Sequence, residues 1–159
     1  DDLVYPHHEC ERAQSEAATG EPLARHWLHQ ALVHIDGEKM SKSRGNLVFV
    51  ADLVEQADPR AVRLALVSQH YRRPWEWHDG LLDAAARRLA RWSATSGRSA
   101  TGDAALGDVR AALDDDLDTP GAIAAIDAAA DAGHDVTAAA ALLGVELGAP
   151  ASGGARRDP

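Results

Sequence analysis

A chain of 159 residues can bury one core of ordinary size, or two small ones. It is 45% hydrophobic but only 4% aromatic, and its apolar residues are mostly Ala, Leu and Val, which predicts an α-rich protein. The net charge of −9 argues against a large nucleic-acid footprint, and the single cysteine excludes an internal disulfide. Because no apolar run approaches about 18 residues, we expect no membrane span and a cytoplasmic protein.

The first third of the sequence alternates helix and strand signals. A helix is predicted over residues 8–19, because these are helix formers and Gly20 follows as a stop signal. Residues 31–35 are partly β-branched and end at an Asp-Gly turn dipeptide, so a strand is predicted there. A loop over residues 38–46 and a second short extended run over residues 47–50 should follow.

After this extended run, the spacing of apolar residues becomes helical. Asp58 followed by Pro59 has the form of an N-cap with proline at the first helical position. Another helix should start near Asp79, and Thr119 with Pro120 repeats the signal of a cap followed by proline. The sequence therefore predicts several helices in this region.

The helical region also contains a loop signal and ends in a tail. Residues 93–107 are rich in Ser, Gly, Thr and Ala and predict a loop, and a last helix should end at Gly144. We therefore expect three parts, which are an α/β piece over residues 1–50, a helical bundle over residues 51–148 and a disordered tail over residues 149–159.

The most distinctive segment of the α/β piece is residues 39–43, Lys-Met-Ser-Lys-Ser, which we call the lysine loop. Two ammonium groups and two hydroxyls in a mobile loop can close on a triphosphate. Preplaced cations can also stabilise the negative charge that develops as pyrophosphate leaves. A solvated basic loop without a ligand is the alternative.

A pair of metal-ligating residue types occurs at the start of the predicted first helix. His7 and Glu11 are four residues apart and share a helix face, so both could reach one Zn²⁺ ion. Two ligands are too few for a tetrahedral site, and His7 could instead cap or pack locally. Cys10 points about 100° away from Glu11, and we interpret it as a small buried hydrophobe.

Further aromatic and imidazole side chains stand just before the predicted strand. Trp27 and His29 should lie near the same region, and we expect a core role for Trp27. The other histidines form no constellation, and we interpret each as structural or surface. They are His26, His34, His70 and His78.

Together these segments resemble cysteinyl-tRNA synthetases and their relatives, the mycothiol-pathway cysteine ligases. The matching stretches are residues 2–9, 13–16, 37–46, 70–72 and 114–120. The resemblance implies an α-rich α/β fold, in which the carboxy-terminal portion of a class I synthetase Rossmann-like domain precedes a helical bundle. It also implies that ATP, carried with Mg²⁺, and cysteine bind to this domain, and that Zn²⁺ selects cysteine by accepting its thiolate as a ligand.

The resemblance also implies roles for individual residues. Lys39 and Lys42 would be catalytic and would bind phosphates, and His7 would be a zinc ligand. Glu11 would either ligate zinc as well or favour the start of the helix through its charge. The residues that would bind ATP or the adenylate are Asp2, Val33, Lys39, Met40, Ser41, Lys42 and Ser43.

Three functions remain open at this point. The first is ligation of activated cysteine to the amine of a glucosaminyl-inositol in mycothiol biosynthesis, because residues 44–50, 58–77 and 144–147 resemble the ligase. The second is aminoacylation of tRNA, because Glu11 and residues 13–16 look like the synthetase. The third is a non-catalytic helical interaction module. The acidic balance disfavours a tRNA partner, which would need a basic track.

The sequence also lacks two elements that the family places upstream. The chain starts at Asp1 without an initiator Met, and we interpret it as a segment that begins within a fold. A His-Ile-Gly-His type signature and the cysteine ligands of zinc would precede it. We therefore expect the chain to be inactive without the amino-terminal half of the same enzyme.

Overall fold

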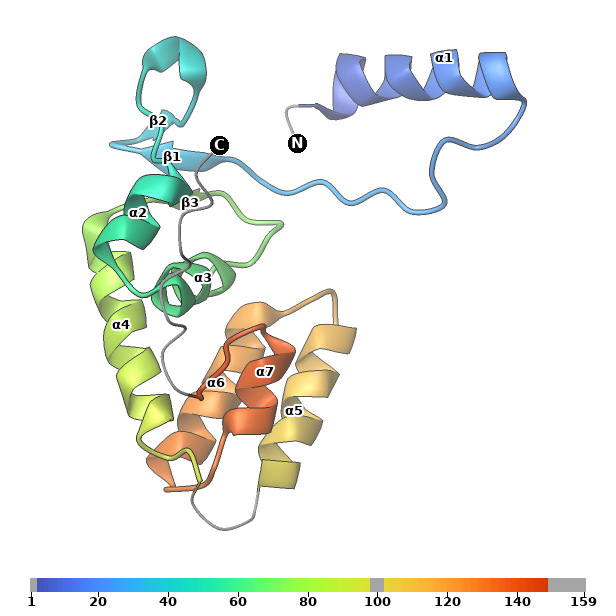
Figure 1. Cartoon of the computed structure of the whole chain (residues 1–159). Coiled ribbons are helices and arrows are strands. Elements are labelled where there is room, and N and C mark those ends of the chain that lie inside the picture. The colour runs from blue at the N-terminus through green and yellow to red at the C-terminus, as the bar shows by residue number, and fades with distance from the viewer. Residues whose placement is uncertain (1–2, 98–101, 149–159) are drawn as a thin grey trace, which may run out of the picture. The chain divides into compact units, whose positions relative to one another are not determined.

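The computed structural model describes residues 3–97 and 102–148 and is rich in helix, with one small mixed sheet (Figure 1). The chain divides into two compact units. The first unit contains residues 1–47 and 70–78, and the second contains residues 48–69 and 79–159. Asp2 and the predicted tail at residues 149–159 lie outside the described residues.

The first unit begins with a helical segment. A π-helical turn, η1 (Val4–His8), leads directly into helix α1 (Glu9–Thr19), which confirms the predicted helix. Gly20 ends α1 with a left-handed φ of 72°, a conformation that glycine adopts without a Cβ clash. No residue of α1 is buried, so the helix contributes nothing to a core within the described chain.

The sheet of the first unit has three strands in the order β2-β1-β3. Strand β1 (Val33–Ile35) confirms the predicted strand, and a turn at Asp36 and Gly37 brings β2 (Glu38–Lys39) back antiparallel to it. On its other edge β1 pairs in parallel with β3 (Trp75–Glu76), so residues about forty positions apart form one sheet.

Two of the predictions for this part of the chain were wrong in part. Residues 38–46 are not all loop, because Glu38 and Lys39 pair with β1 and a 3₁₀ turn, η2 (Lys42–Arg44), follows. In the predicted extended run at residues 47–50, Phe49 is extended, with φ −93° and ψ 128°, but Val50 already begins helix α2 (Val50–Gln56) and the run pairs with no strand in the described chain. A short run without a hydrogen-bonding neighbour has nothing to hold it as a strand.

The second unit is a set of packed helices around one core. Its other helices are α3 (Pro59–Val67), α4 (Asp79–Ser93), α5 (Gly102–Asp114), α6 (Thr119–Asp131) and α7 (Thr137–Leu142). Its largest fully buried side chains include Trp92, Leu64, Ile126 and Val109. None of the helices described is long and apolar enough to cross a membrane.

The helix starts in this unit follow their capping residues. The Asp58 carboxylate accepts the backbone N–H of Arg60 at 2.8 Å, which confirms the predicted cap of α3. For α6 the cap is Asp118, which accepts the Gly121 N–H at 3.0 Å, so the predicted cap at Thr119 was one residue late.

The predicted loop at residues 93–107 was too long. Its end lies in α5, which begins at Gly102, and Ala105 is buried in the core. Burial of small apolar residues offsets the weak helix propensity of the flanking glycines. Residues 98–101 lie outside the described residues.

Candidate functional site

The lysine loop lies within a well-defined backbone frame in the first unit. Lys39 is the last residue of β2, and the Met40 N–H donates to the Val33 carbonyl at 2.9 Å. Ser41 is extended, with φ −156° and ψ 153°, and the turn η2 then starts at Lys42. Gly45 closes the turn with a left-handed φ of 70°. The two lysines of the loop are therefore carried by different backbone elements.

Asn46 holds the loop, and sequence reasoning assigned no role to it. Its side-chain oxygen Oδ1 accepts the Ser41 N–H at 2.9 Å, and its nitrogen Nδ2 donates to the Lys39 carbonyl at 3.2 Å. An ion pair between Arg44 and Glu38 also spans the loop. The sequence signal for this role of Asn46 was the Gly45-Asn46 dipeptide, because glycine and asparagine commonly close turns.

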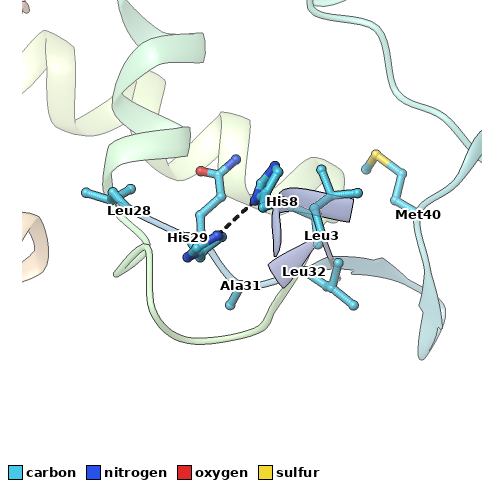
Figure 2. A pocket seen from close by; sticks show the side chains of 9 residues that line it. Leu3, His8, Leu28, His29, Ala31, Leu32 and Met40 are labelled. Atoms are coloured by element: carbon cyan, nitrogen blue, oxygen red, sulfur yellow. Dashed lines mark hydrogen bonds between the residues drawn. The ribbon is translucent and has the colours of Figure 1, made fainter. Parts of the chain in front are cut away.

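A cavity of about 360 Å³ lies beside this frame, and Figure 2 shows its lining side chains. Val33 and Met40 both line it, so the structure brings together two of the residues expected to bind ATP. The remaining lining residues are Leu3, His8, Leu28, His29, Gln30, Ala31 and Leu32. Its wall is mostly apolar with two imidazoles, a composition that suits a flat heteroaromatic ligand.

The other predicted members of the loop do not line this cavity. Ser41, Lys42 and Ser43 lie beyond its wall, and the Ser41 and Ser43 hydroxyls are 3.3 Å apart. Lys42 and Ser43 are exposed, whereas Lys39 is half-buried. One exposed and one half-buried lysine beside an apolar cavity are the arrangement expected for a ligand with a buried ring and charged phosphates.

His8 and His29, which both line this cavity, form a cluster with the indole of Trp27. His8 Nδ1 and His29 Nε2 are 2.9 Å apart in a hydrogen bond, which Figure 2 shows as a dashed line. Desolvation of the half-buried ring, followed by the charges of His29 and His7, lowers the pKa of His8. The Trp27 ring stacks on His29 with a centroid distance of 6.1 Å. The prediction that Trp27 and His29 lie near the same region is therefore confirmed, whereas sequence reasoning gave no role to His8.

Two predictions about burial in this region were wrong. Trp27 is 42% exposed and stacks on His29, so it belongs to the imidazole cluster and not to a core. Cys10 is exposed and is not a small buried hydrophobe. Both errors have one cause, because neither α1 nor the segment that contains Trp27 packs onto a core in the described chain.

The predicted metal ligands fit only part of a zinc site. His8 and Glu9 have helical backbone angles, so His7 and Glu11 keep their spacing of one helical turn. Within the described residues, no group of three or more His, Cys, Asp or Glu side chains could hold a metal ion. An imidazole and a carboxylate are suitable zinc donors, but a complete site needs ligands from elsewhere.

A third segment of the first unit contacts the chain just before β1. The Ala31 N–H donates to the Tyr71 carbonyl at 2.7 Å, and the His70 and Tyr71 rings stack with centroids 5.2 Å apart. Arg72 lies over the Tyr71 ring at 5.1 Å. Tyr71 and Arg72 also line a polar cavity of about 480 Å³ together with Trp27. The other predicted structural or surface histidines, His26, His34 and His78, are exposed or half-buried.

Comparisons with known proteins give the chain a context. A family model described as "tRNA synthetases class I (C) catalytic domain" matches residues 1–87. The chain is also similar to proteins named L-cysteine:1D-myo-inositol 2-amino-2-deoxy-alpha-D-glucopyranoside ligase. The relative from Thermobispora bispora is 52% identical over 157 residues, which are 92% of this chain and 39% of the relative.

Two further relatives carry the same name. The protein from Acidothermus cellulolyticus is 55% identical over 157 residues, with 92% of this chain and 39% of the relative covered. The protein from Thermobifida fusca is 55% identical over 136 residues, with 83% and 33% covered. The chain thus spans about two-fifths or less of the length of these curated relatives.

Proposed function

Because the chain belongs to the family of class I tRNA synthetase catalytic domains, we propose that it forms one side of an ATP-dependent cysteine-activating site. The whole enzyme would join the activated cysteine to the amine of a glucosaminyl-inositol. The observation that carries this proposal is an identity of about half over nine-tenths of the chain to ligases named for that reaction. The first unit would be the carboxy-terminal part of a Rossmann-like domain, and the second a helical bundle domain.

The reaction would proceed in two steps. The cysteine carboxylate attacks the α-phosphate of ATP, which forms cysteinyl-adenylate and releases pyrophosphate. The neutral amine of the amino sugar then attacks the activated carbonyl, loses a proton and releases AMP as the amide forms. The first step develops negative charge on the leaving pyrophosphate, and the second needs an acceptor beside the adenylate.

The lysine loop would serve the first step. Lys39 and Lys42 would offset the charge on the phosphates of ATP, which is carried with Mg²⁺, and on the pyrophosphate as it leaves. Ser41 and Ser43 would donate hydroxyl hydrogen bonds to phosphate oxygens. Val33 and Met40 would lie against the adenine, because both line the apolar cavity next to the loop. Asp2 would contact the adenylate.

The helix start would contribute to the choice of amino acid. His7 and Glu11 would hold Zn²⁺ with further ligands supplied by the amino-terminal half of the enzyme. When bound, Zn²⁺ takes a thiolate as a ligand far more readily than a hydroxyl, which favours cysteine over serine. Glu11 could instead favour the start of α1 by its charge, and substitution separates these roles. Glu11→Gln would lower zinc content only if Glu11 is a ligand.

Aminoacylation of cysteine tRNA is the second candidate, and one observation favours it. The family model that matches residues 1–87 is named for tRNA synthetases. The net charge of −9 opposes it, because a tRNA partner needs a basic track. Gel retardation of the complete enzyme with cysteine tRNA separates the two, since binding at submicromolar concentration would support the synthetase.

The test of the ligase proposal uses the complete polypeptide that includes this chain. With cysteine and ATP alone it should catalyse ATP–pyrophosphate exchange, and addition of glucosaminyl-inositol should start release of AMP and formation of the amide. Exchange with cysteine but no AMP release with the amino sugar would exclude this acceptor. Residues 1–159 alone should be inactive in exchange, and activity of that fragment would contradict the need for the amino-terminal half.

A further inference from the structure

The strand that carries Lys39 has two edges, and both are hydrogen-bonded in the described chain. On one edge, the Met40 N–H donates to the Val33 carbonyl of the chain that forms β1. Because backbone groups alternate in direction along an extended chain, the Lys39 carbonyl and the Ser41 N–H point to the other edge. Asn46 binds both of these groups, at 3.2 Å and 2.9 Å.

A carboxamide is suited to this edge because it has a donor and an acceptor side by side. A neighbouring strand would donate one N–H to the Lys39 carbonyl and would accept the Ser41 N–H with one C=O. In this loop, Nδ2 of Asn46 is the donor and Oδ1 of Asn46 is the acceptor. Aspartate has no donor in its ionised form, and serine cannot reach both groups. Asn46 therefore takes the place of a short additional strand beside β2.

The hydrogen bonds of Asn46 also affect the position of Lys42. Residues 42–45 lie between the strand and Asn46, and they form a tight turn closed by Arg44 N–H to Ser41 carbonyl and Gly45 N–H to Lys42 carbonyl bonds, both 3.2 Å. The two Asn46 hydrogen bonds close this turn against the end of β2. The direction in which Lys42 leaves the strand that carries Lys39 is thus set by the Asn46 carboxamide.

We propose that Asn46 is a positioning residue of the lysine loop, which fixes Lys42 relative to Lys39 through its hydrogen bonds to Ser41 and Lys39. This inference rests on the proposed function of the two lysines in ATP activation. The charge on the leaving pyrophosphate develops in the transition state, so misplacing Lys42 lowers kcat. ATP binding in the ground state also uses the adenine cavity, so the KM for ATP changes less.

The test compares three forms of the complete enzyme in cysteine-dependent ATP–pyrophosphate exchange, at varied ATP. Asn46→Ala should lower kcat by roughly 10- to 100-fold, the range expected when catalytic groups are displaced by about an ångström. The KM for ATP should change less than about threefold. Glu38→Gln is the matched control, because it removes the exposed ion pair to Arg44 in the same loop and should leave kcat within about twofold.

A readout that does not depend on activity separates the inference from the proposed function. Hydrogen exchange at the Ser41 amide should be slow in the wild type, faster in Asn46→Ala and still slow in Asn46→Asp, which keeps the acceptor. Asn46→Asp loses the donor to Lys39, so its kcat should fall as well. Melting temperatures of all variants should agree within a few degrees, because the loop lies outside the core.

The possible results separate the positioning role of Asn46 from the proposed function. An unprotected Ser41 amide in the wild type, or an unchanged kcat in Asn46→Ala, would overturn the positioning role. A raised KM for ATP at constant kcat would also overturn it, because the loop would then contribute to binding alone. A wild-type enzyme with a protected Ser41 amide but no exchange with cysteine would contradict the proposed function and leave the hydrogen-bonded frame intact.

Discussion

The two units of the chain differ in how much apolar surface they bury. Among the described residues, the first unit has two buried hydrophobic side chains, Ala31 and Trp77, and all other buried hydrophobic residues belong to the second. Large apolar side chains of the first unit are exposed, such as Tyr5 at 77% and Leu28 at 60%. The second unit instead has one continuous core that involves α3 to α7.

The second unit is thus built around its own core, whereas the described part of the first unit buries little apolar surface. Small units with little buried apolar surface are marginally stable by themselves. In the first unit the side chains with candidate functions lie on walls of cavities and on an exposed loop, where they can contact a ligand or further chain. Four predictions test this contrast, in order of decreasing expected effect.

The largest effect should come from the core tryptophan of the second unit. Trp92 is fully buried, and its indole N–H donates to Asp127 at 2.8 Å. Trp92→Ala should lower the free energy of unfolding by about 3–5 kcal/mol, because it leaves a large cavity. The matched variant Trp27→Ala should cost less than about 1 kcal/mol. Urea denaturation followed by circular dichroism measures both, and equal costs would remove the contrast between the units.

The next effect concerns activity instead of stability. Lys42→Ala in the complete enzyme should reduce cysteine-dependent ATP–pyrophosphate exchange by roughly 100- to 1000-fold, as removal of one electrostatic donor to a transition state does. Arg110→Ala, on the exposed face of α5, is the control and should leave the rate unchanged. An unchanged rate in Lys42→Ala would favour the non-catalytic interpretation of the first unit.

A smaller effect is expected at the start of α6. Asp118→Ala removes the acceptor of the Gly121 N–H and should destabilise the second unit by about 1 kcal/mol. Asp115→Ala removes a neighbouring exposed carboxylate that caps no helix and should change the free energy of unfolding by less than about 0.5 kcal/mol. A shift of the urea midpoint in the second variant alone would show that the cap is assigned to the wrong residue.

The smallest effect is a pH dependence at the start of α3. Side-chain hydrogen bonds from Arg60 hold the pKa of the Asp58 carboxyl below its usual value. As the pH falls, the unfolded chain therefore binds a proton at Asp58 before the folded chain does. The stabilising contribution of Asp58 is present above about pH 4 and is lost as the pH falls through the folded pKa. Asp58→Asn should be less stable than wild type at pH 7 by less than about 1 kcal/mol. The urea midpoints measured at pH 7 and at pH 3 should therefore differ less in Asp58→Asn than in the wild type.

Much of the fold was predictable because its signals are local. The end of α1 at Gly20 and the cap of α3 at Asp58 follow from the conformations that a few neighbouring residues favour. The exposure of Trp27 and Cys10 was not predictable in this way. Whether a side chain is covered depends on segments far away in the sequence, and the described chain contains none that cover them.

The candidate site was predictable only in its composition. The motif spacing identified the lysine loop and the pair His7 and Glu11, and the roles of these residues stay predictions. Sequence reasoning missed the hydrogen bond between His8 and His29. It also gave Asn46 no role, although Gly45 and Asn46 lie just after the loop and are residue types that commonly close turns. Both depend on which side chains meet across a turn or between segments.

The sequence by itself determined the end of α1 at Gly20, the turn at Asp36 and Gly37, the cap of α3 and the family that the motifs resemble, because each depends on short-range conformational preference or on spacing along the chain. Only the tertiary structure decided that residues 70–78 join the first unit through β3, that Val33 and Met40 share a cavity and that Asn46 closes the lysine loop. Such pairings form across a turn or between strands far apart in the sequence, where satisfying backbone hydrogen bonds outweighs local preference.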